Sequence, residues 1–267
     1  MASKREQLKK QRKKFFQGMG IPEKKEFVID DFQREAIEYL IDGYDTLVVA
    51  PTGSGKTYIA VEAIQAILYS GGHAIYTTPL KALSNTKYTE FKARFEPDFS
   101  VGLLTGDRKI DTDADLVVAT TEIFRNELYH YSERYSVVIL DEIHFIADEN
   151  RGPVWEESII LTPSSCTLVM LSASISNPEE IAEWIESVRG KECKIVLRKG
   201  RPVELRYGFM HPEYGIIPLY DPSGAISKEV LKFYGDAGLD KTNLRLKIPR
   251  RRKAHMRFGG RRWKKRR

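Results

Sequence analysis

A glycine-rich segment at residues 50–57 constrains this chain more than any other part of its sequence. It reads Ala-Pro-Thr-Gly-Ser-Gly-Lys-Thr, follows an apolar run of strand character and precedes a run with helical spacing. Ala50 stands where a phosphate-binding loop usually has its first glycine, but Gly53 and Gly55 still let backbone N–H groups approach a phosphate. A strand, a loop and a helix start in this order indicate an anion site rather than a chance glycine turn, because free N–H groups and the helix dipole point at the ligand.

Two acidic residues close a second apolar run. Residues 135–140 read Tyr-Ser-Val-Val-Ile-Leu, which is typical of a strand buried on both faces of a parallel sheet, and Asp141 and Glu142 follow it. Open α/β sheets bind ligands at the carboxyl ends of their strands. An Asp there can hold Mg²⁺, usually through water, and the Glu beside it can accept a proton from an attacking water. A lone Asp-Glu pair means little, but this pair, downstream of a phosphate loop, predicts a nucleoside triphosphatase.

Strand and helix signals alternate along most of the chain, which predicts an α/β fold with a mainly parallel sheet covered by helices on both faces. Beyond about residue 201 the alternation decays into Pro and Gly punctuation, although 203–209 could form one more strand. The predicted strands are 46–50, 73–78, 101–104, 116–120, 136–141, 167–172 and 194–197, and the predicted helices are 31–40, 56–69, 80–95, 121–130, 152–160 and 178–188.

Charge is segregated along the chain. The formal net charge is +6, yet residues 1–14 carry seven Lys or Arg and one Glu, and residues 249–267 carry eleven Lys or Arg and no acid. The stretch 15–248 therefore carries 25 basic and 36 acidic residues, a net of −11. Blocks of like charge repel themselves, so we expect both ends to be disordered when free. Their expected partner is a polyphosphate backbone, the alternative being tails that only aid solubility.

Composition indicates a protein of the cytoplasm, or of the nucleus if the organism is eukaryotic. The chain has 267 residues, of which 42% are hydrophobic, so it can bury a full core. No run of 18 apolar residues is present, and the basic N-terminus has no apolar stretch that could act as a secretory signal, so we expect no membrane partner. Cys166 and Cys193 are too few and too isolated for a disulfide or zinc framework.

The motifs, with their spacing, resemble those of superfamily-two DExH helicases, and among them the Ski-type RNA helicases that feed RNA-decay machinery. The resemblance runs from about residue 27 to residue 206, and Asp-Glu-Ile-His at 141–144 is the motif that names the group. One motif is weak support, whereas a series in the family's order is highly specific. The other matching segments are Phe-Val-Ile-Asp-Asp-Phe-Gln at 27–33, Tyr-Thr-Thr-Pro-Leu-Lys-Ala-Leu-Ser-Asn at 76–85, Gly-Leu-Leu-Thr-Gly-Asp at 102–107, Ala-Thr-Thr-Glu-Ile at 119–123, Arg-Gly-Pro-Val-Trp-Glu-Glu at 151–157, and Ser-Ala-Ser at 172–174, where the family has Ser-Ala-Thr.

The resemblance implies a RecA-like P-loop domain that binds ATP and Mg²⁺. Lys56 would neutralise the β- and γ-phosphates, and Thr57 and Asp141 would hold Mg²⁺, partly through water. Glu142 would activate the attacking water. The further nucleotide-binding residues that it implies are Phe27, Gln33, Pro51, Thr52, Gly53, Ser54 and Gly55.

Three of these assignments concern the surroundings of the phosphates. Gln33 would hydrogen-bond the adenine, and Phe27 would stack on the base or on the neighbouring wall. His144 would relay between the ATP site and a coupling segment, although a single imidazole near a strand end is often only a core group. The coupling segment consists of Ser172, Ala173 and Ser174.

A single nucleic-acid strand is the second expected ligand, and RNA is favoured on the resemblance alone. Hydroxyls, glycine N–H groups and helix N-termini at strand ends can bind phosphates without reading bases. The alternative for each threonine is a helix cap, with Thr120 or Thr121 capping the helix expected from Glu122. For Trp155, packing of its helix against the sheet is favoured over base stacking. The residues expected along the strand are Pro79, Lys81, Thr105, Gly106, Thr120, Thr121 and Arg125.

The chain departs from the family in what it lacks. Complete helicases place ATP between two RecA-like domains, and the second supplies arginines through a Gln-x-x-Gly-Arg-x-Gly-Arg segment that is missing here. We therefore expect weak hydrolysis until a second domain is supplied, since such arginines are worth about 10³–10⁵ in rate. The predicted division is a disordered basic tail at 1–26, a RecA-like domain at 27–206, a linker or the start of a further element at 207–248, and a disordered basic tail at 249–267.

The predicted function is that of the first ATPase domain of a Ski-type RNA helicase. Paired with a second RecA-like domain, it would couple hydrolysis to movement along a strand, and the resemblance adds an RNA-decay complex as a partner. Two alternatives stay open. One is a DNA helicase of the related DExH branch, since nothing in the sequence reads a 2′-hydroxyl. The other is a non-catalytic nucleic-acid-binding module that keeps an ATP pocket as a switch.

Overall fold

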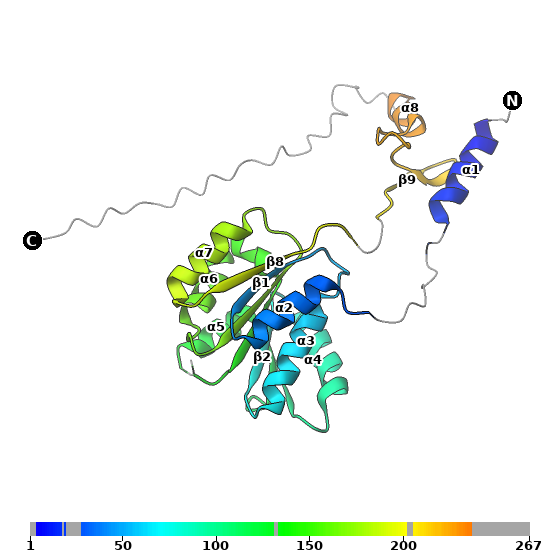
Figure 1. Cartoon of the computed structure of the whole chain (residues 1–267). Coiled ribbons are helices and arrows are strands. Elements are labelled where there is room, and N and C mark those ends of the chain that lie inside the picture. Colours follow the sequence, from blue (N-terminus) through cyan, green and yellow to red (C-terminus); the bar gives the residue numbers. More distant parts are fainter. Residues whose placement is uncertain (1–3, 18, 20–27, 131–132, 202–204, 237–267) are drawn as a thin grey trace, which may run out of the picture. The chain divides into compact units, whose positions relative to one another are not determined.

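The computed structural model describes residues 4–17, 19, 28–130, 133–201 and 205–236. The chain divides into two compact units, of which the larger spans residues 25–204 and the smaller combines 1–24 with 205–267 (Figure 1). The predictions made for Phe27 and for the basic tail at 249–267 lie outside the described residues. Within those described ranges, no helix has the length and apolar character needed to cross a membrane.

The larger unit is built on one sheet of eight strands in the order β4-β3-β5-β2-β6-β7-β1-β8. Neighbouring strands run parallel, except that β4 is antiparallel to β3 at the edge. The prediction of a mainly parallel sheet is therefore confirmed. The strands are β1 (Asp45–Val49), β2 (Ala74–Thr78), β3 (Val101–Leu104), β4 (Lys109–Ile110), β5 (Leu116–Thr120), β6 (Val137–Asp141), β7 (Thr167–Ser172) and β8 (Cys193–Leu197).

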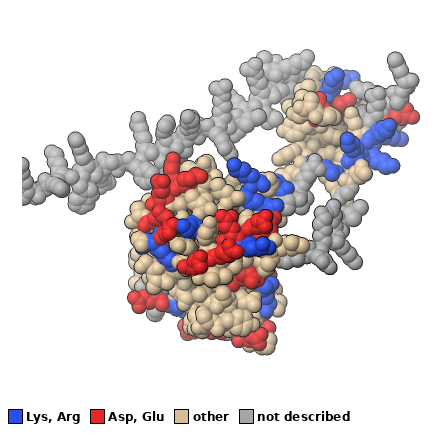
Figure 2. Space-filling view, viewed as in Figure 1, with Lys and Arg blue, Asp and Glu red and all other residues tan. Residues whose placement is uncertain are grey.

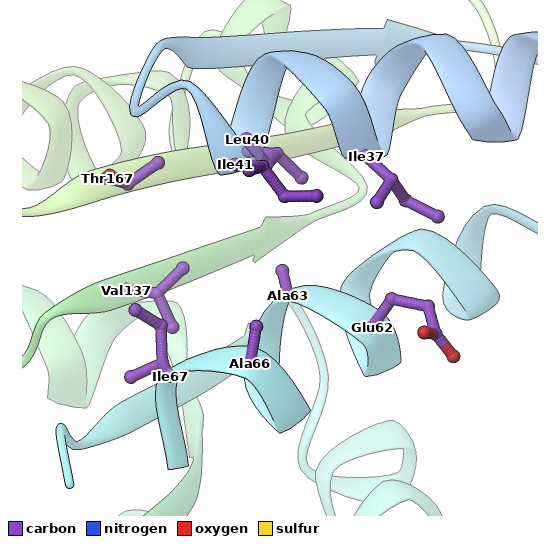
Figure 3. Close-up of a pocket in the computed structure, with 9 residues that line it drawn as sticks. All are labelled: Ile37, Leu40, Ile41, Glu62, Ala63, Ala66, Ile67, Val137 and Thr167. Carbon is purple, nitrogen blue, oxygen red and sulfur yellow. The ribbon is translucent and has the colours of Figure 1, made fainter. Parts of the chain in front are cut away.

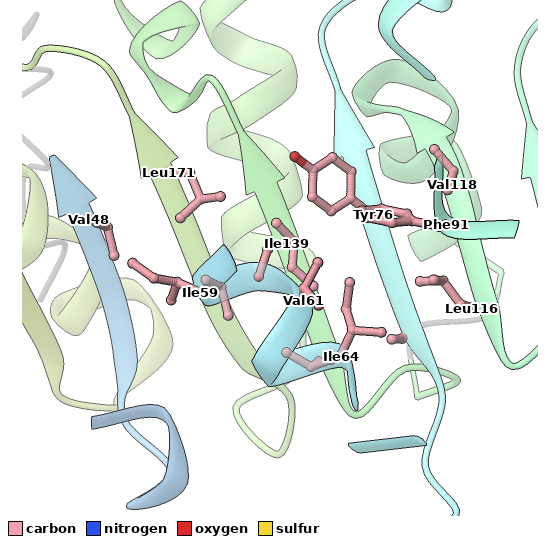
Figure 4. Close-up of a cluster of buried hydrophobic side chains, with 14 of the residues drawn as sticks. Val48, Ile59, Val61, Ile64, Tyr76, Phe91, Leu116, Val118, Ile139 and Leu171 are labelled. Carbon is pink, nitrogen blue, oxygen red and sulfur yellow. The ribbon is translucent and has the colours of Figure 1, made fainter. Parts of the chain in front are cut away.

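Helices cover both faces of this sheet, because successive residues of a strand point to opposite sides (Figure 1). Val48 packs on one side with Ile59 of the helix that follows the glycine loop, as Figure 4 shows, whereas Leu47 packs on the other side in a cluster that contains Trp155. Trp155 is fully buried, so its predicted packing role is confirmed. The helices of this unit are α2 (Asp31–Ile41), α3 (Lys56–Tyr69), α4 (Lys81–Phe95), α5 (Thr121–Leu128), the 3₁₀ turn η1 (Ile143–Ala147), α6 (Gly152–Leu161) and α7 (Pro178–Arg189).

A buried ion pair holds the beginning of β1. Asp45 and Arg189, at the end of α7, both have side chains without solvent exposure, and Arg189 Nε lies 2.5 Å from Asp45 Oδ2. Asp45 Oδ1 also accepts a hydrogen bond of 2.8 Å from the backbone N–H of Leu168 in β7. Arg189 donates further to backbone carbonyls, including a bond of 2.7 Å to Cys166 O. These contacts satisfy both buried charges and join β1 to β7 and α7.

The smaller unit contains more regular structure than the sequence predicts. Helix α1 (Lys4–Phe16) lies within the segment expected to be a disordered tail. The segment expected to be a linker or the start of a further element forms an antiparallel hairpin of β9 (Gly208–His211) and β10 (Gly215–Pro218), followed by helix α8 (Lys228–Asp236). The hairpin agrees with the second alternative, the start of a further element, and β9 overlaps the strand considered at 203–209. Helix α1 was not predicted, because side chains distant in sequence support it and the composition of a single segment does not report such contacts.

Replacing Arg189 by Ala is expected to destabilise the protein strongly, because Asp45 would stay buried without its main partner. The expected loss is about 3–5 kcal/mol in the free energy of unfolding. Urea denaturation followed by tryptophan fluorescence measures it, since Trp155 is fully buried. Lys194→Ala is the matched control, because Lys194 pairs with Glu192 near the surface and should cost less than about 1 kcal/mol. A similar small loss for both variants would contradict this account of the network.

Candidate active site

The sheet order gathers the predicted site residues at one edge. The strands of the larger unit run parallel apart from β4, so the segments that follow them emerge on the same side. The glycine loop follows β1, the Ser-Ala-Ser segment ends β7, and the Asp-Glu pair ends β6, and these three strands are consecutive in the sheet. The segments expected to contact nucleic acid follow β2, β5 and β3, which are also consecutive. The edge is thus divided into two halves.

Lys56 is folded back onto its own loop. Its Nζ donates a hydrogen bond of 2.7 Å to Ala50 O and one of 3.4 Å to Pro51 O. Partial burial lowers the pKa of Lys56, while the nearby Glu142 and Asp141 carboxylates oppose that shift. The hydrogen-bond acceptors of this ammonium are neutral carbonyls. A phosphate oxygen would be a stronger acceptor because it is charged, so a bound phosphate could replace them.

Two glycines shape the loop. Gly53 and Gly55 have φ angles of +85° and +84°, which disfavour any residue with a side chain. A Cβ on Gly55 would also lie 2.5 Å from Gln33 Nε2, whereas nothing lies within 4 Å of the Cβ position at Gly53. Space is therefore open over the middle of the loop, where a phosphate would approach.

Gln33 of α2 is hydrogen-bonded to the glycine loop. Its side chain is buried, its Nε2 donates a hydrogen bond of 3.0 Å to Gly55 O, and its Oε1 accepts one of 2.9 Å from the N–H of Asp30 at the start of α2. The structure thus places Gln33 against the glycine loop, as a nucleotide-binding role requires. Its hydrogen bond to adenine remains a prediction.

The residues present fit a triphosphate with Mg²⁺. Ser54 Oγ is buried in the loop without a hydrogen-bond partner, an orphan that a ligand oxygen would satisfy. The described residues contain no group of three or more His, Cys, Asp or Glu side chains that could hold a metal by themselves. Mg²⁺ suits such a site, because it commonly binds through one or two carboxylates, waters and substrate phosphates.

Asp141 is held by two hydrogen bonds. Tyr76 on β2 donates its hydroxyl to Asp141 Oδ2 at 2.6 Å, and the N–H of Glu142 donates to Oδ1 at 2.9 Å. Tyr76 is fully buried. Its pKa is well above the usual value, mainly because of this burial and secondly because of the Asp141 carboxylate, so the hydroxyl keeps its proton. Glu142 has a φ of +56°, which turns the backbone sharply after the strand.

Glu142 is poised to accept a proton. Burial raises its pKa first and the Asp141 carboxylate adds to this, whereas His144 and Lys56 lower it. His144 Nδ1 lies 3.1 Å from Glu142 Oε2, which makes an ion pair when the imidazole is protonated. Neither atom has a hydrogen-bond partner beyond this contact among the described residues. A carboxyl with a raised pKa and a vacant lone pair is suited to general-base chemistry.

An aromatic stack supports His144 from behind. Its ring is stacked on Phe145 with centroids 4.8 Å apart, and Phe145 is stacked on Trp155 of α6 at 5.7 Å. The guanidinium of Arg151 lies 4.1 Å from the Phe145 centroid. The orientation of the imidazole toward Glu142 is therefore set by packing that reaches into α6.

The coupling segment is bound to the glycine loop through the backbone. The N–H of Ala50 donates a hydrogen bond of 3.0 Å to Ser172 O. The hydroxyl of Ser172 is paired within its own segment, because it accepts a bond of 3.3 Å from the N–H of Ser174. Among the described residues no hydrogen bond joins His144 to either serine, so its partner is Glu142 and the predicted relay has no direct contact here.

Three exposed or half-exposed residues remain in the half of the edge expected to bind nucleic acid. Lys81 Nζ lies 3.2 Å from Asp107 Oδ1 beside the exposed Gly106, and Arg125 Nη1 lies 2.6 Å from Glu157 Oε2. Both cations are therefore paired with surface carboxylates, and such pairs are weak enough to exchange for phosphate.

The other predicted residues of this half are buried, and two of the threonine hydroxyls are hydrogen-bonded within the protein, so their contacts with phosphate stay predictions. Thr121 Oγ1 donates to Thr78 O at 3.3 Å, and Thr105 Oγ1 donates to Asp107 Oδ1 at 3.0 Å. Thr120 stands at the N-cap position of α5, as one of the two predicted alternatives, although its side chain makes no capping hydrogen bond. The buried members are Pro79, Thr105, Thr120 and Thr121.

An apolar groove lies away from this chemistry. It is bordered by α2 and α3 and reaches Val137 and Thr167, the first residues of β6 and β7 (Figure 3). It therefore opens at the amino ends of the strands, opposite the edge that carries the Asp-Glu pair. Its other lining residues are Ile37, Leu40, Ile41, Glu62, Ala63, Ala66 and Ile67.

Sequence reasoning missed the residues that hold the site in place. Tyr76 reads as one more apolar strand residue, and nothing in its segment signals the bond to Asp141. Arg198, after β8, pairs with Asp30, and its guanidinium lies 5.1 Å from the centroid of the Phe32 ring. No local pattern marks such contacts, because the partners are far apart in sequence.

The sequence of this chain matches a known protein family. Residues 30–181 match the DEAD/DEAH box helicase family. The probable helicase HelY of Mycobacterium tuberculosis is 48% identical over 182 residues, which are 67% of this chain and 20% of that protein. The human exosome RNA helicase MTR4 is 44% identical over 184 residues, 68% of this chain and 17% of that protein. The chain thus spans about a fifth of the length of these relatives, and the predicted resemblance to Ski-type DExH helicases is confirmed.

A solved structure shares the fold. The crystal structure of the DUF1998 helicase MrfA bound to DNA superposes with a TM-score of 0.55 at 22% identity, covering 70% of this chain and 29% of that one. At this identity the likeness supports the α/β fold of the larger unit and nothing finer.

Replacing His144 by Phe is expected to move the acid limb of the ATPase pH profile to higher pH. The proton-accepting form of Glu142 is lost as pH falls through its raised pKa, and His144 is one of the groups that keep that pKa down. Phe preserves a ring that can stack on Phe145 but removes the imidazole. His73→Phe, away from the pair, is the control and should leave the limb in place. An unmoved limb in the first variant would exclude this role for His144.

Proposed function

Because this chain belongs to the DEAD/DEAH box helicase family, we propose that it is the ATP-binding domain of an RNA helicase. The observation that carries the proposal is the juxtaposition of a glycine loop, whose Lys56 ammonium is hydrogen-bonded to the loop's own carbonyls, with an acid pair two strands away in the sheet. The choice of RNA is supported by the relative named as an exosome RNA helicase.

Nucleotide binding would begin with the loop. The triphosphate would enter above Gly53, accept hydrogen bonds from the loop N–H groups and draw Lys56 Nζ away from Ala50 O. Thr57 and Asp141 would hold Mg²⁺ with water between, and the ion would neutralise charge on the β- and γ-phosphates. Gln33 would bring the adenine against the wall formed by the start of α2.

Hydrolysis would then depend on Glu142. Its carboxylate would accept a proton from the water that attacks the γ-phosphate, and His144 would orient it and take up part of the developing charge. Asp141 is already fixed by Tyr76 and by a backbone N–H, so it needs little reorganisation. A second RecA-like domain would supply the arginines that stabilise the transition state, worth about 10³–10⁵ in rate.

RNA would lie across the β2, β5 and β3 half of the edge. Lys81 and Arg125 would exchange Asp107 and Glu157 for phosphates, and Gly106 would offer its N–H. In the complete enzyme, closure of two domains on ATP and reopening after hydrolysis would move the strand, in the setting of an RNA-decay complex. ATPase turnover of a two-domain protein with poly-RNA and with poly-DNA tests this. Equal stimulation by both would favour a DExH helicase without RNA preference, and no stimulation would favour an ATP-switched binding module.

Lys56→Ala is expected to weaken ATP binding about 10- to 100-fold, because a charge-assisted hydrogen bond is worth about 1.5–3 kcal/mol. Fluorescent ATP-analogue titration of the 267-residue chain measures it. Lys92→Ala, which removes an exposed lysine paired with Glu96 on α4, is the control and should bind normally. Unchanged affinity in Lys56→Ala would show that the loop is not the phosphate site.

Glu142→Gln is expected to abolish hydrolysis while leaving ATP binding within about threefold. The amide has nearly the same shape but cannot accept the proton, so the rate should fall about 10²–10⁴-fold. Single-turnover hydrolysis and analogue binding are measured on the same preparation. Loss of binding together with hydrolysis would assign Glu142 to a structural or metal-holding role.

A further inference from the structure

Helix α1 is a dense block of positive charge that holds a regular structure. Its sequence, from Lys4 to Phe16, contains seven Lys or Arg and one Glu. Like charges at helical spacing destabilise an isolated helix, and a helix of 13 residues is marginal in water. Something else must therefore stabilise it, and the described contacts of the smaller unit identify what that is.

The hairpin anchors one face of α1, and Arg206, just before the hairpin, anchors its C-terminal end. Arg206 Nη1 donates to Phe15 O at 2.8 Å and to Gln17 O at 2.6 Å, which satisfies carbonyls that a helix end leaves free. Arg12 Nη1 donates to Tyr214 O at 3.1 Å. The Phe15 ring lies against Gly208, where an added Cβ would be 3.1 Å from Phe15 Cζ.

The hairpin is itself supported from its other side. Phe209 and His211 alternate with Gly208 along β9, and both pack against Phe233 of α8, with ring centroids 5.5 Å and 5.3 Å away. The small unit thus has its own aromatic core, and α1 lies on the face of the hairpin opposite to α8. This arrangement gives α1 a fixed orientation within its unit.

The anchoring leaves a row of lysines free. Arg12 and Phe15 are three residues apart, so they share the face turned to the hairpin. On a helix of 3.6 residues per turn, Lys10, Lys13 and Lys14 point to the opposite side. Lys9, four residues before Lys13 and three before Arg12, lies on the flank between the two sides. All of these lysines are exposed. Figure 2 shows Lys and Arg side chains gathered on this unit.

We propose that the lysine face of α1, formed by Lys9, Lys10, Lys13 and Lys14, binds the phosphate backbone of single-stranded RNA outside the helicase edge. Fixed cations at helical spacing are complementary to a chain of phosphates, and their binding releases counterions. An anionic membrane fits less well, because surface helices need an apolar face, and here Phe15 is committed to the hairpin and Phe16 is only 37% exposed. The proposal rests on the proposed function only for the choice of RNA as the polyanion.

The test is a salt titration of the 267-residue chain on a labelled mixed-sequence RNA strand of about 20 nucleotides. Single strands lose about 0.7 in the slope of log K against log salt for each phosphate neutralised. Lys9→Ala with Lys13→Ala should therefore make the slope shallower by about 1.4, and the fourfold variant by about 2.8. A DNA strand of the same sequence should lose as much, since lysine–phosphate contacts do not read the sugar.

The matched control removes the same charge from the same unit. Lys228 and Lys232 are exposed and four residues apart on α8, so their double Ala variant copies the change without touching α1. Its slope should match that of the unchanged chain. Alanine favours helix, and circular dichroism checks that each variant stays folded. Lys9→Glu with Lys13→Glu should flatten the slope further than the Ala pair does.

Equal slopes for the α1 variants, the α8 variant and the unchanged chain would overturn the proposal, and so would a loss of the same size in both double variants. Loss of binding to phosphatidylserine vesicles with unchanged RNA slopes would assign the face to a membrane and also overturn it. ATP-analogue binding is measured in parallel on every variant. A flattened RNA slope with no ATP binding by the unchanged chain would sustain this inference while contradicting the proposed function.

Discussion

Strand β1 is held at both of its ends, and the position of the catalytic edge depends on this. At its beginning, the buried Asp45–Arg189 ion pair joins it to α7, and the Asp45 carboxylate accepts a hydrogen bond from the N–H of Leu168 in β7. At its other end the N–H of Ala50 continues the pairing with β7 through Ser172 O. The glycine loop therefore leaves the sheet from a fixed point. This places Lys56 close enough to Glu142 and Asp141 for their carboxylates to oppose the lowering of its pKa by burial.

A side chain of β2 joins the two halves of the edge at the acid pair. β2 and β6 are neighbours, and Tyr76 on β2 donates its hydroxyl to Asp141 at the end of β6. The same strand leads into Lys81, one of the exposed cations of the nucleic-acid half. A change at Asp141 on nucleotide binding would thus be felt by the strand that presents Lys81. A second connection runs from the acid pair to helix α6, because His144 stacks on Phe145 and Phe145 stacks on Trp155.

Local signals predicted what is local in the structure. The glycine loop, the acid pair and the alternation of strands and helices are readable because each depends on a few adjacent residues, and the boundaries of α3 match the prediction. Burial of Thr105, Thr120 and Thr121 was not readable, because a hydroxyl at a strand end looks the same whether it faces solvent or a neighbouring carbonyl. Helix α1 was missed for a related reason, since the residues that anchor it, Arg206 among them, lie about 190 residues away in the sequence.

A crystal structure of this chain with a non-hydrolysable ATP analogue and Mg²⁺ tests the central claim most directly, that the loop carbonyls hold Lys56 in place of a triphosphate. The account predicts the analogue's phosphates above Gly53, Lys56 Nζ moved from Ala50 O to a phosphate oxygen, and Ser54 Oγ with a ligand or water partner. The Ala50–Ser172 backbone bond should be retained. A bound analogue elsewhere, with Lys56 Nζ still 2.7 Å from Ala50 O, would contradict it.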